Sequence, residues 1–230
     1  MERVSIILPC HNGAAFIADA ITSVLHQSRV VDEIILVDDG SSDGSADVFA
    51  DVCADVCAAY APPVQIIRQS RQGAGAARNR GLAASSGDII GFLDADDGWP
   101  LDSVAVRLDH MAATGADIVF GIVRQCRHLV GEGAPGIGPD MAGRLAGTML
   151  VRRAIFDRIG DFDPKLPSGE VVEWVARAAD AGAVMTDCNA LTLYRRVHGG
   201  NMMLQRPDAS GEALAMLRQT LARRRASSVA

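Results

Sequence analysis

The chain has 230 residues, of which 49% are hydrophobic and 4% aromatic, and its formal net charge is −6. This size and composition suffice for one large α/β domain or two small ones. The negative charge argues against a nucleic-acid binder, because such proteins normally present a basic face. The sequence has no apolar segment long enough to predict a transmembrane helix, and its first residues lack a signal-peptide layout. We therefore expect a cytosolic, cytoplasmic protein.

The first half of the chain alternates short apolar segments with segments whose apolar residues have helical spacing. Strands are expected at 4–8, 34–37, 64–67 and 89–93, and helices at 14–26, 45–59 and 75–85. This alternation predicts right-handed βαβ units and an α/β fold with a mainly parallel central sheet flanked by helices. Ligands bind beyond the carboxyl ends of strands in such sheets, so the loops at 9–13, 38–44 and 94–98 should open onto one edge.

The second half is less regular. Helices are expected at 101–113, 152–159 and 171–181, a strand at 117–123, and short β-like segments at 183–186 and 191–197. Residues 129–143 are rich in Gly and Pro and predict a loop that is either a lid or disordered. Residues 202–230 are expected to form a helical tail that ends in three arginines. These arginines are either a solvated end or a weak peripheral contact with anionic lipid.

Three carboxylates follow the buried strand at 89–93, namely Asp94, Asp96 and Asp97. Like charges at this spacing repel each other, and desolvation penalises each of them. A divalent cation would offset that cost, and Mg²⁺ and Mn²⁺ prefer oxygen ligands and are often shared with substrate phosphates. The alternative is a turn and a helix start, because Asp and Gly favour turns and Pro100 suits the first turn of a helix.

A second acidic loop, residues 38–44, follows the strand at 34–37. A carboxylate there can accept a hydrogen bond from a base N–H or a ribose hydroxyl, whereas Ser41, Ser42 or Asp43 can cap the next helix. The two interpretations are compatible, with Asp43 as the cap and Asp39 as the ligand.

A glycine loop at 69–75 leads into a helix that carries Arg78 and Asn79 in its first turns. Helix N-termini attract anions, and an arginine adds a bidentate phosphate donor. The Gly-x-Gly pattern is weak evidence by itself, because it lacks the Rossmann fingerprint and the Walker lysine. Arg78 is therefore either a phosphate ligand or an ordinary surface residue.

These pieces occur in a fixed order along the chain. The order is Val4-Ser-Ile-Ile-Leu-Pro-Cys-His-Asn12, Ile35-Leu-Val-Asp-Asp-Gly-Ser-Ser-Asp43, Ala77-Arg-Asn-Arg-Gly-Leu82 and Phe92-Leu-Asp-Ala-Asp-Asp97. Together they resemble the inverting family-2 glycosyltransferases of the GT-A fold, densely over the first 100 or so residues. The resemblance implies one GT-A domain at 1–201, with a nucleotide-sugar-binding half at 1–100 and a more variable acceptor half at 101–201.

The resemblance implies roles for five residues around the nucleotide. Pro9, His11 and Asn12 match the loop that touches the nucleotide, with His11 in place of the usual aromatic residue. Asp39 matches the acid that holds the base, and Arg78 matches an arginine near the nucleotide.

The resemblance also implies a cation site. Asp94, Asp96 and Asp97 match the Asp-x-Asp motif, which binds the ribose and a Mg²⁺ or Mn²⁺ ion that bridges the diphosphate. The segment Tyr194-Arg-Arg-Val-His-Gly-Gly-Asn201 resembles the family's late Arg-x-His segment, in which His198 would ligate the metal or touch the diphosphate. Neutral imidazole is a suitable metal ligand.

The family's catalytic base usually lies in a Gly-Glu-Asp segment, which here is Ser168-Gly-Glu-Val-Val-Glu-Trp174. Glu170 matches the first acid and Val171 replaces the second. Glu170 is therefore the candidate base, with Glu173 as the weaker candidate. The alternative for Glu170 is stabilisation of the first turn of a helix by a negative side chain.

The resemblance implies a hexosyltransferase that moves a sugar, with inversion, from a nucleoside-diphosphate sugar to an acceptor hydroxyl. The expected donor is a UDP-sugar, and the acceptor is a glycan, a lipid-linked molecule or a small molecule. Acceptor contacts are expected from residues 129–149. The alternative is a nucleotide-sugar-binding module that is catalytically impaired, indicated by Val171 and His11. A nucleotidyltransferase is the third possibility, although its glycine-and-lysine triphosphate signature is missing.

Overall fold

The structure is a computed structural model that describes residues 2–60, 62–129 and 134–199, without the side chains of 55–60. The predicted helical tail at 202–230 lies outside the described residues. In the part of the chain that is described, no helix is both long and apolar enough to cross a membrane.

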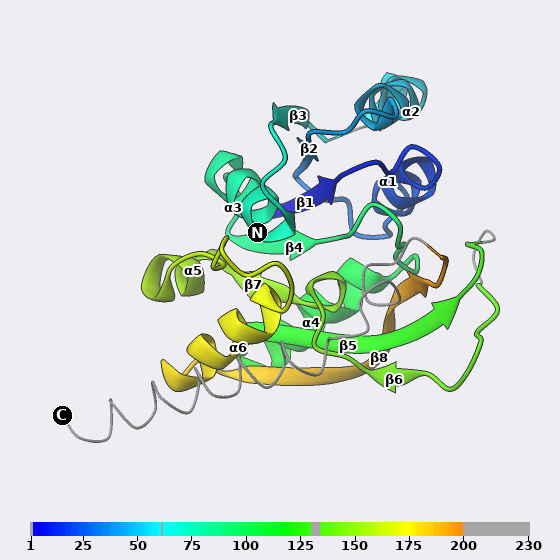
Figure 1. Cartoon of the computed structure of the whole chain (residues 1–230). Helices are drawn as coiled ribbons and strands as arrows, with labels where there is room; N and C mark the ends of the chain where they lie inside the picture. The colour runs from blue at the N-terminus through cyan, green and yellow to red at the C-terminus, as the bar shows by residue number, and fades with distance from the viewer. Residues whose placement is uncertain (1, 61, 130–133, 200–230) are drawn as a thin grey trace.

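A single sheet runs through the centre of the described chain (Figure 1). Its strands are β1 (Val4–Cys10), β2 (Glu33–Asp39), β3 (Val64–Gln69), β4 (Ile89–Phe92), β5 (Ile118–Cys126), β6 (Met141–Ala142), β7 (Leu150–Arg152) and β8 (Met185–Arg196). They lie in the order β3-β2-β1-β4-β7-β5-β6, and β8 pairs with β5. The first four strands are parallel to one another and β8 is parallel to β5, whereas β6 and β7 are antiparallel to their neighbours. The predicted mainly parallel α/β sheet is therefore confirmed.

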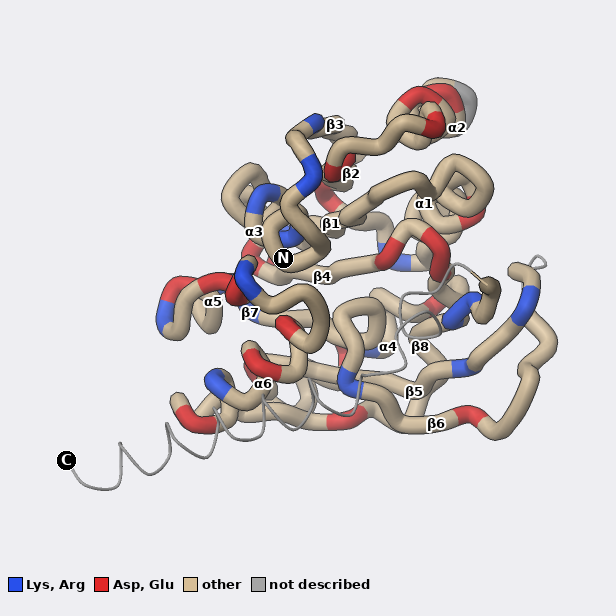
Figure 2. The backbone as a smooth tube through the Cα atoms, viewed as in Figure 1, with Lys and Arg blue, Asp and Glu red and all other residues tan. Residues whose placement is uncertain are grey.

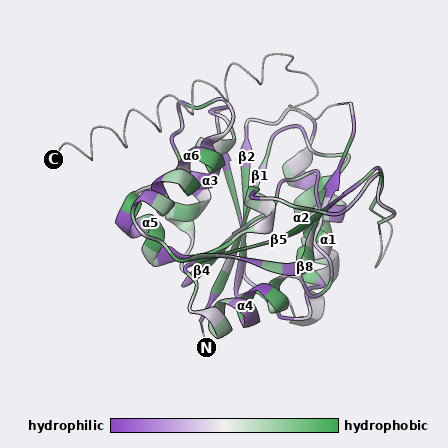
Figure 3. Cartoon of the chain, turned by 90° about the horizontal axis from the view of Figure 1, so that it is seen from below, coloured by the Kyte–Doolittle hydropathy of each residue, from purple (hydrophilic) through white to green (hydrophobic). Residues whose placement is uncertain are grey.

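Helices cover both faces of this sheet, as Figure 3 shows. They are α1 (Ile17–Leu25), α2 (Ser45–Tyr60), α3 (Ala74–Ala84), α4 (Ser103–Thr114), α5 (Arg153–Ile159) and α6 (Glu170–Asp180), with a 3₁₀ turn η1 (Ala146–Thr148). Apolar side chains of α1, α2 and α4 share one core cluster, and those of α3, α5 and α6 pack on the other face. Burial on both faces explains why every residue of β1 and β4 is buried and why apolar residues do not simply alternate with polar ones along them.

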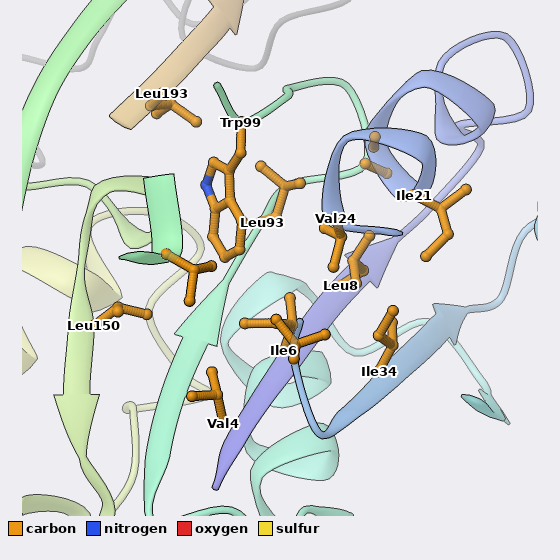
Figure 4. Close-up of a cluster of buried hydrophobic side chains, with 14 of the residues drawn as sticks. Val4, Ile6, Leu8, Ile21, Val24, Ile34, Leu93, Trp99, Leu150 and Leu193 are labelled. Atoms are coloured by element: carbon orange, nitrogen blue, oxygen red, sulfur yellow. The ribbon is translucent and has the colours of Figure 1, made fainter. Parts of the chain in front are cut away.

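The alternation of side chains along β1 connects the two helix layers. Ile6 and Leu8 point into the cluster with Ile21 of α1, as Figure 4 shows, whereas Ile7 faces Leu82 of α3. All five side chains are 4% exposed or less, and burying each of them stabilises the fold by roughly 1.5–3 kcal/mol. The strands are therefore held by packing on both faces of the sheet.

Several predicted boundaries are wrong. β1 continues through Pro9 to Cys10. Pro9 has no backbone N–H to donate, but β4 pairs only with residues up to Ile7, so no hydrogen bond of the sheet is lost at Pro9. The β-like segments at 183–186 and 191–197 belong to one strand, β8, whose register against β5 shifts near Ile122. The short strands β6 and β7 and the turn η1 were not predicted, because two or three residues give no periodic signal.

Candidate active site

A cleft of about 530 Å³ lies at the carboxyl ends of β1, β2 and β4. Every predicted nucleotide and metal residue lines it, namely Pro9, His11, Asn12, Asp39, Arg78, Asp94, Asp96, Asp97 and His198. Phe16, Arg71 and Arg195 also line the cleft and were not predicted. Figure 2 shows acidic segments in red where β2 and β4 end, so the predicted meeting of two acidic loops at one edge is observed.

The loops after β1 and β2 are joined through Asn12, which has a positive φ of 52°. The Asn12 backbone N–H donates to Ser41 Oγ at 2.9 Å, and its side-chain oxygen accepts from the Ser42 N–H at 2.9 Å. His11 Nδ1 lies 2.9 Å from the carbonyl oxygen of Asp39. Because a carbonyl oxygen can only accept, Nδ1 carries the proton in this hydrogen bond. Asparagine adopts this backbone conformation more readily than most residues, so the loop geometry fits the sequence.

Asp39 holds the loop that leads into α3. Its carboxylate accepts from Gln69 Nε2 at 2.8 Å and from the backbone N–H groups of Gln72 and Gly73, both at 2.7 Å. Asp39 is 4% exposed, and a carboxylate has about four acceptor positions, so these three bonds leave room for about one more. Gly73 has a φ of 99°, a conformation that favours glycine, immediately before α3 begins.

Arg78 connects two acids on different elements. It donates to Glu170 Oε1 on α6 and to Asp94 Oδ1, the latter at 2.5 Å. Burial would lower the pKa of Arg78, but the Asp94 and Glu170 carboxylates outweigh it and raise that pKa. The Nε of Arg78 finds no hydrogen-bond partner among the described residues. Gly75 allows this close packing, because a Cβ there would lie 3.3 Å from Glu170 Cγ.

The three acids after β4 differ in exposure. The side chains of Asp94 and Asp96 are 42% and 31% exposed, whereas Asp97 is 6% exposed and accepts from the Arg196 N–H at 2.9 Å. Burial, and then the charge of Asp94, raises the pKa of Asp96. Burial, and then the charges of Asp96 and Asp94, raises the pKa of Asp97 well above its ordinary value. A cation among these groups would offset the repulsion that raises both pKa values.

Asp96 and His198 form a hydrogen-bonded pair in the cleft. Asp96 Oδ2 lies 3.1 Å from His198 Nε2, and both side chains are partly exposed in the cleft. Two ligand atoms at adjacent corners of an octahedron, each about 2.1 Å from Mg²⁺, lie about 3.0 Å apart. Among the described residues no group of three or more His, Cys, Asp or Glu side chains could hold a metal. The distance within the pair matches that between two neighbouring ligands of one ion, and the metal role of both residues stays a prediction.

The two candidate bases lie in the first turn of α6, outside the set of residues that line the cleft. Glu170 is 7% exposed and ion-paired with Arg78, which does line the cleft. Glu173 accepts from Arg177 Nε at 3.0 Å, and Arg177 also donates to the backbone carbonyl groups before Phe162. Val171 is 8% exposed and belongs to the hydrophobic core. Glu170 is thus connected to the cleft through Arg78, and Glu173 has a structural partner.

The expected acceptor region lies apart from this cleft. None of the described residues between 129 and 149 lines it. Residues 146–149 are buried, and the carbonyl oxygen of Gly147 accepts from Trp99 Nε1 at 2.8 Å. The acceptor role of this region stays a prediction.

This α/β fold, with its acidic cleft at the strand ends, is typical of nucleotide-sugar transferases. The sequence model of the family described as Glycosyl transferase family 2 matches residues 5–162, more than half of the chain. The chain therefore belongs to glycosyl transferase family 2.

Two curated relatives have similar sequences. An uncharacterized glycosyltransferase, alr2836 of Nostoc sp., is 29% identical over 91% of this chain and 69% of its own length. The glycosyltransferase AglE of Haloferax volcanii is 29% identical over 80% of this chain and 63% of its own length. The chain thus spans about two thirds of the length of these relatives.

Two solved structures share the fold at low sequence identity. The mannosyltransferase PcManGT of Pyrobaculum calidifontis, in complex with GDP-Man and Mn²⁺, has a TM-score of 0.74 at 18% identity, over 96% of this chain and 64% of that one. TarS residues 1–349 of S. aureus, in complex with UDP-GlcNAc, has a TM-score of 0.71 at 17% identity, over 87% of this chain and 60% of that one. These similarities show the fold, and this chain spans less than two thirds of each solved chain.

Proposed function

We propose that this protein transfers a sugar from a nucleoside-diphosphate sugar, with a UDP-sugar as the first candidate, to an acceptor hydroxyl. The reaction is a single displacement with inversion, and it requires Mg²⁺ or Mn²⁺. The observation that carries this proposal is the 3.1 Å pair of Asp96 and His198 in the same cleft as Arg78 and Asp39. The acceptor is a glycan, a lipid-linked molecule or a small molecule.

Each residue group has a separate task in this proposal. Asp96, Asp97 and His198 would hold the cation, which would neutralise charge on the leaving nucleoside diphosphate. Asp94 binds the ribose, and the loop fixed by Asp39 positions the base. These tasks orient the donor before reaction, which is where such enzymes obtain much of their rate.

Glu170 is the proposed base, and it can act in this role only when its ion pair with Arg78 is broken. A carboxylate paired with an arginine is a weak base, because the cation stabilises its charged form. Phosphates of a bound donor would compete for the Arg78 guanidinium and release Glu170 toward the acceptor hydroxyl. A general base must come within hydrogen-bond reach of that proton.

The second candidate function is a nucleotide-sugar-binding module that does not transfer the sugar. Two observations favour it, namely the buried ion pair of Glu170 and the packing of Val171 in the hydrophobic core. In that case Arg78 stays bound to Glu170 when the donor binds, and no base reaches the acceptor.

A donor screen followed by turnover assays tests both functions. Thermal unfolding with Mn²⁺ is measured against UDP-GlcNAc, UDP-glucose and GDP-mannose, because a ligand that binds only the folded state raises the unfolding temperature. Calorimetry with UDP, in Mn²⁺ and in EDTA, then measures the contribution of the cation. Transfer or donor hydrolysis that requires Mn²⁺ supports the transferase. Tight binding without turnover, across donors and acceptors, supports the module, and no nucleotide binding contradicts both.

A further inference from the structure

Arg196, the last residue of β8, joins separate parts of the chain beside the cleft. Its guanidinium donates to Asp19 Oδ2 in the first turn of α1 at 2.6 Å, and to the carbonyl oxygen of Asp96 at 3.1 Å. Its backbone N–H donates to Asp97 Oδ1 at 2.9 Å. One residue therefore connects the beginning of α1 to both acids of the cation site.

Phe16, immediately before α1, contacts both Arg196 and His198. The Arg196 guanidinium lies 4.9 Å from the centroid of the Phe16 ring, within the range of a cation–π contact. The ring centroids of Phe16 and His198 are 4.4 Å apart, and His198 Nε2 lies 3.1 Å from Asp96. The imidazole is thus fixed by an aromatic ring and a carboxylate that come from two different elements.

Arg196 is 7% exposed and is not among the residues that line the cleft, so it can act on a bound ligand only through the groups that it holds. We propose that Arg196, with Phe16 and Asp19, positions His198 and Asp96 for a divalent cation. This inference rests on the cation-dependent reaction proposed above. It adds residues that do not bind the cation themselves but hold the two side chains that do. Loss of such outer contacts typically lowers metal affinity 10- to 100-fold.

Charge and geometry predict opposite results when Arg196 is replaced. If Arg196 acted only through its positive charge, its removal would leave the acids more negative and would tighten cation binding. If it acts by position, its removal frees Asp96 and His198 to move and weakens cation binding. Lysine separates the two effects, because it keeps the charge but lacks the planar fork that reaches Asp19 and Asp96 together.

The test measures Mn²⁺ binding to the full chain by calorimetry at saturating UDP. We expect at least tenfold weaker Mn²⁺ binding in Arg196→Lys and Arg196→Gln, with UDP binding in EDTA changed less than threefold. Arg124→Lys is the matched control, because Arg124 makes a comparable two-bond pair with Asp140 at 2.8 and 2.6 Å outside the cleft lining. Its Mn²⁺ affinity should equal that of the wild type.

A double-mutant cycle adds a readout that general damage to the fold would not produce. Because Arg196 is proposed to act partly through His198, Arg196→Lys should cost less Mn²⁺ affinity in a His198→Ala background than in the wild type. Full additivity overturns the proposal. If the Arg196 variants fail to fold, Asp19→Ala, at a half-exposed side chain, and Phe16→Leu take their place and must weaken Mn²⁺ binding.

The outcomes separate this inference from the proposed function. Unchanged Mn²⁺ affinity in Arg196→Lys, or tighter binding in Arg196→Gln, overturns the positioning role and leaves the proposed transfer intact. A wild-type chain that binds UDP but no Mn²⁺ overturns the positioning role and the cation requirement together.

Discussion

Arg78 and Glu170 form an ion pair between α3 and α6 in which the two side chains are 5% and 10% exposed. Arg78 lines the cleft and also holds Asp94, so one guanidinium connects the candidate base to a candidate ribose ligand. A ligand phosphate that bound Arg78 would leave the buried Glu170 carboxylate without its cation, so the pair is sensitive to such a ligand. In the proposed mechanism, the state of this pair decides between transfer and binding alone.

We predict that Glu170→Gln lowers kcat for sugar transfer at least 100-fold, because a positioned general base contributes about 10²–10⁴-fold. UDP affinity in EDTA should not fall, since Glu170 is not among the residues that line the cleft and its neutralisation leaves Arg78 more available to phosphate. Steady-state transfer assays and calorimetry measure the two quantities on the same preparation.

Glu173→Gln is the matched control, because Glu173 lies one turn along α6 and pairs with Arg177. This variant should lose about 1 kcal/mol of unfolding free energy and keep kcat within about threefold. A Glu170→Gln enzyme that transfers at the wild-type rate would exclude Glu170 as the base. A large loss of kcat in Glu173→Gln alone would move the assignment to Glu173.

Asp96→Asn should raise the Mn²⁺ concentration needed for half-maximal donor turnover by about 10- to 100-fold. The reason is that an amide oxygen is a weaker ligand than a carboxylate for a hard cation. Asp102→Asn, at an exposed acid just before α4, is the control and should leave this concentration unchanged. Equal Mn²⁺ dependence of the two variants would remove Asp96 from the cation site.

Asp39→Asn should loosen the loop between β3 and α3. The carboxylate accepts two backbone N–H bonds and one amide bond, and an asparagine would present its NH₂ group to one of these donors. We expect a loss of roughly 1–3 kcal/mol in urea unfolding, the cost of an unsatisfied buried group. UDP and GDP affinity should fall together, because the loop rather than one base is disturbed. A loss confined to UDP would show instead that Asp39 itself recognises the base.

The sequence predicted the parts of this molecule that depend on local pattern. The parallel strands, and the acids at the carboxyl ends of two of them, Asp39 and Asp94, could be inferred from apolar runs that end in polar loops. Strands of two or three residues cannot be predicted from such a pattern. The position of β7, for example, is fixed by its pairing with β4 and β5 rather than by its own residues.

The partners of the site residues could not be predicted either, because they too are brought together by the fold rather than by local sequence. Arg78 and Glu170 are 92 positions apart in the sequence, and they meet only because α3 and α6 pack on the same face of the sheet. Phe16 gives no sequence signal beyond an apolar position at the start of a helix, and its contact with His198 depends on where β8 ends. Arg196 carried a signal, since it opens the Arg-x-His segment, but only the structure shows what it holds.

Glu33 links stability to pH at the beginning of β2. Its carboxylate accepts hydrogen bonds from the Ser5 hydroxyl and from the backbone N–H groups of Ser86 and Gly87. Burial alone would raise the pKa of Glu33, but these hydrogen bonds outweigh it and lower that pKa below its ordinary value. A lowered pKa in the folded state gives stability that is present above the unfolded pKa of about 4.3. This stability is lost as the pH falls through the folded value.

Glu33→Gln should therefore lower the free energy of unfolding by about 1 kcal/mol at pH 7. This loss is smaller than that expected for a fully buried charged hydrogen bond, because Glu33 is partly exposed to solvent. The difference from the wild type should shrink as the pH falls below the unfolded pKa of Glu33 and through its lowered folded pKa, where the wild-type carboxylate takes up its proton. Urea unfolding at pH 7, 5, 4 and 3.5 measures it. Glu2→Gln, at an exposed ion pair with Arg152, is the control and should change stability by less than about 0.5 kcal/mol throughout. A Glu33→Gln difference that grows toward acid would mean that the hydrogen bonds favour the protonated form, the reverse of what the structure indicates.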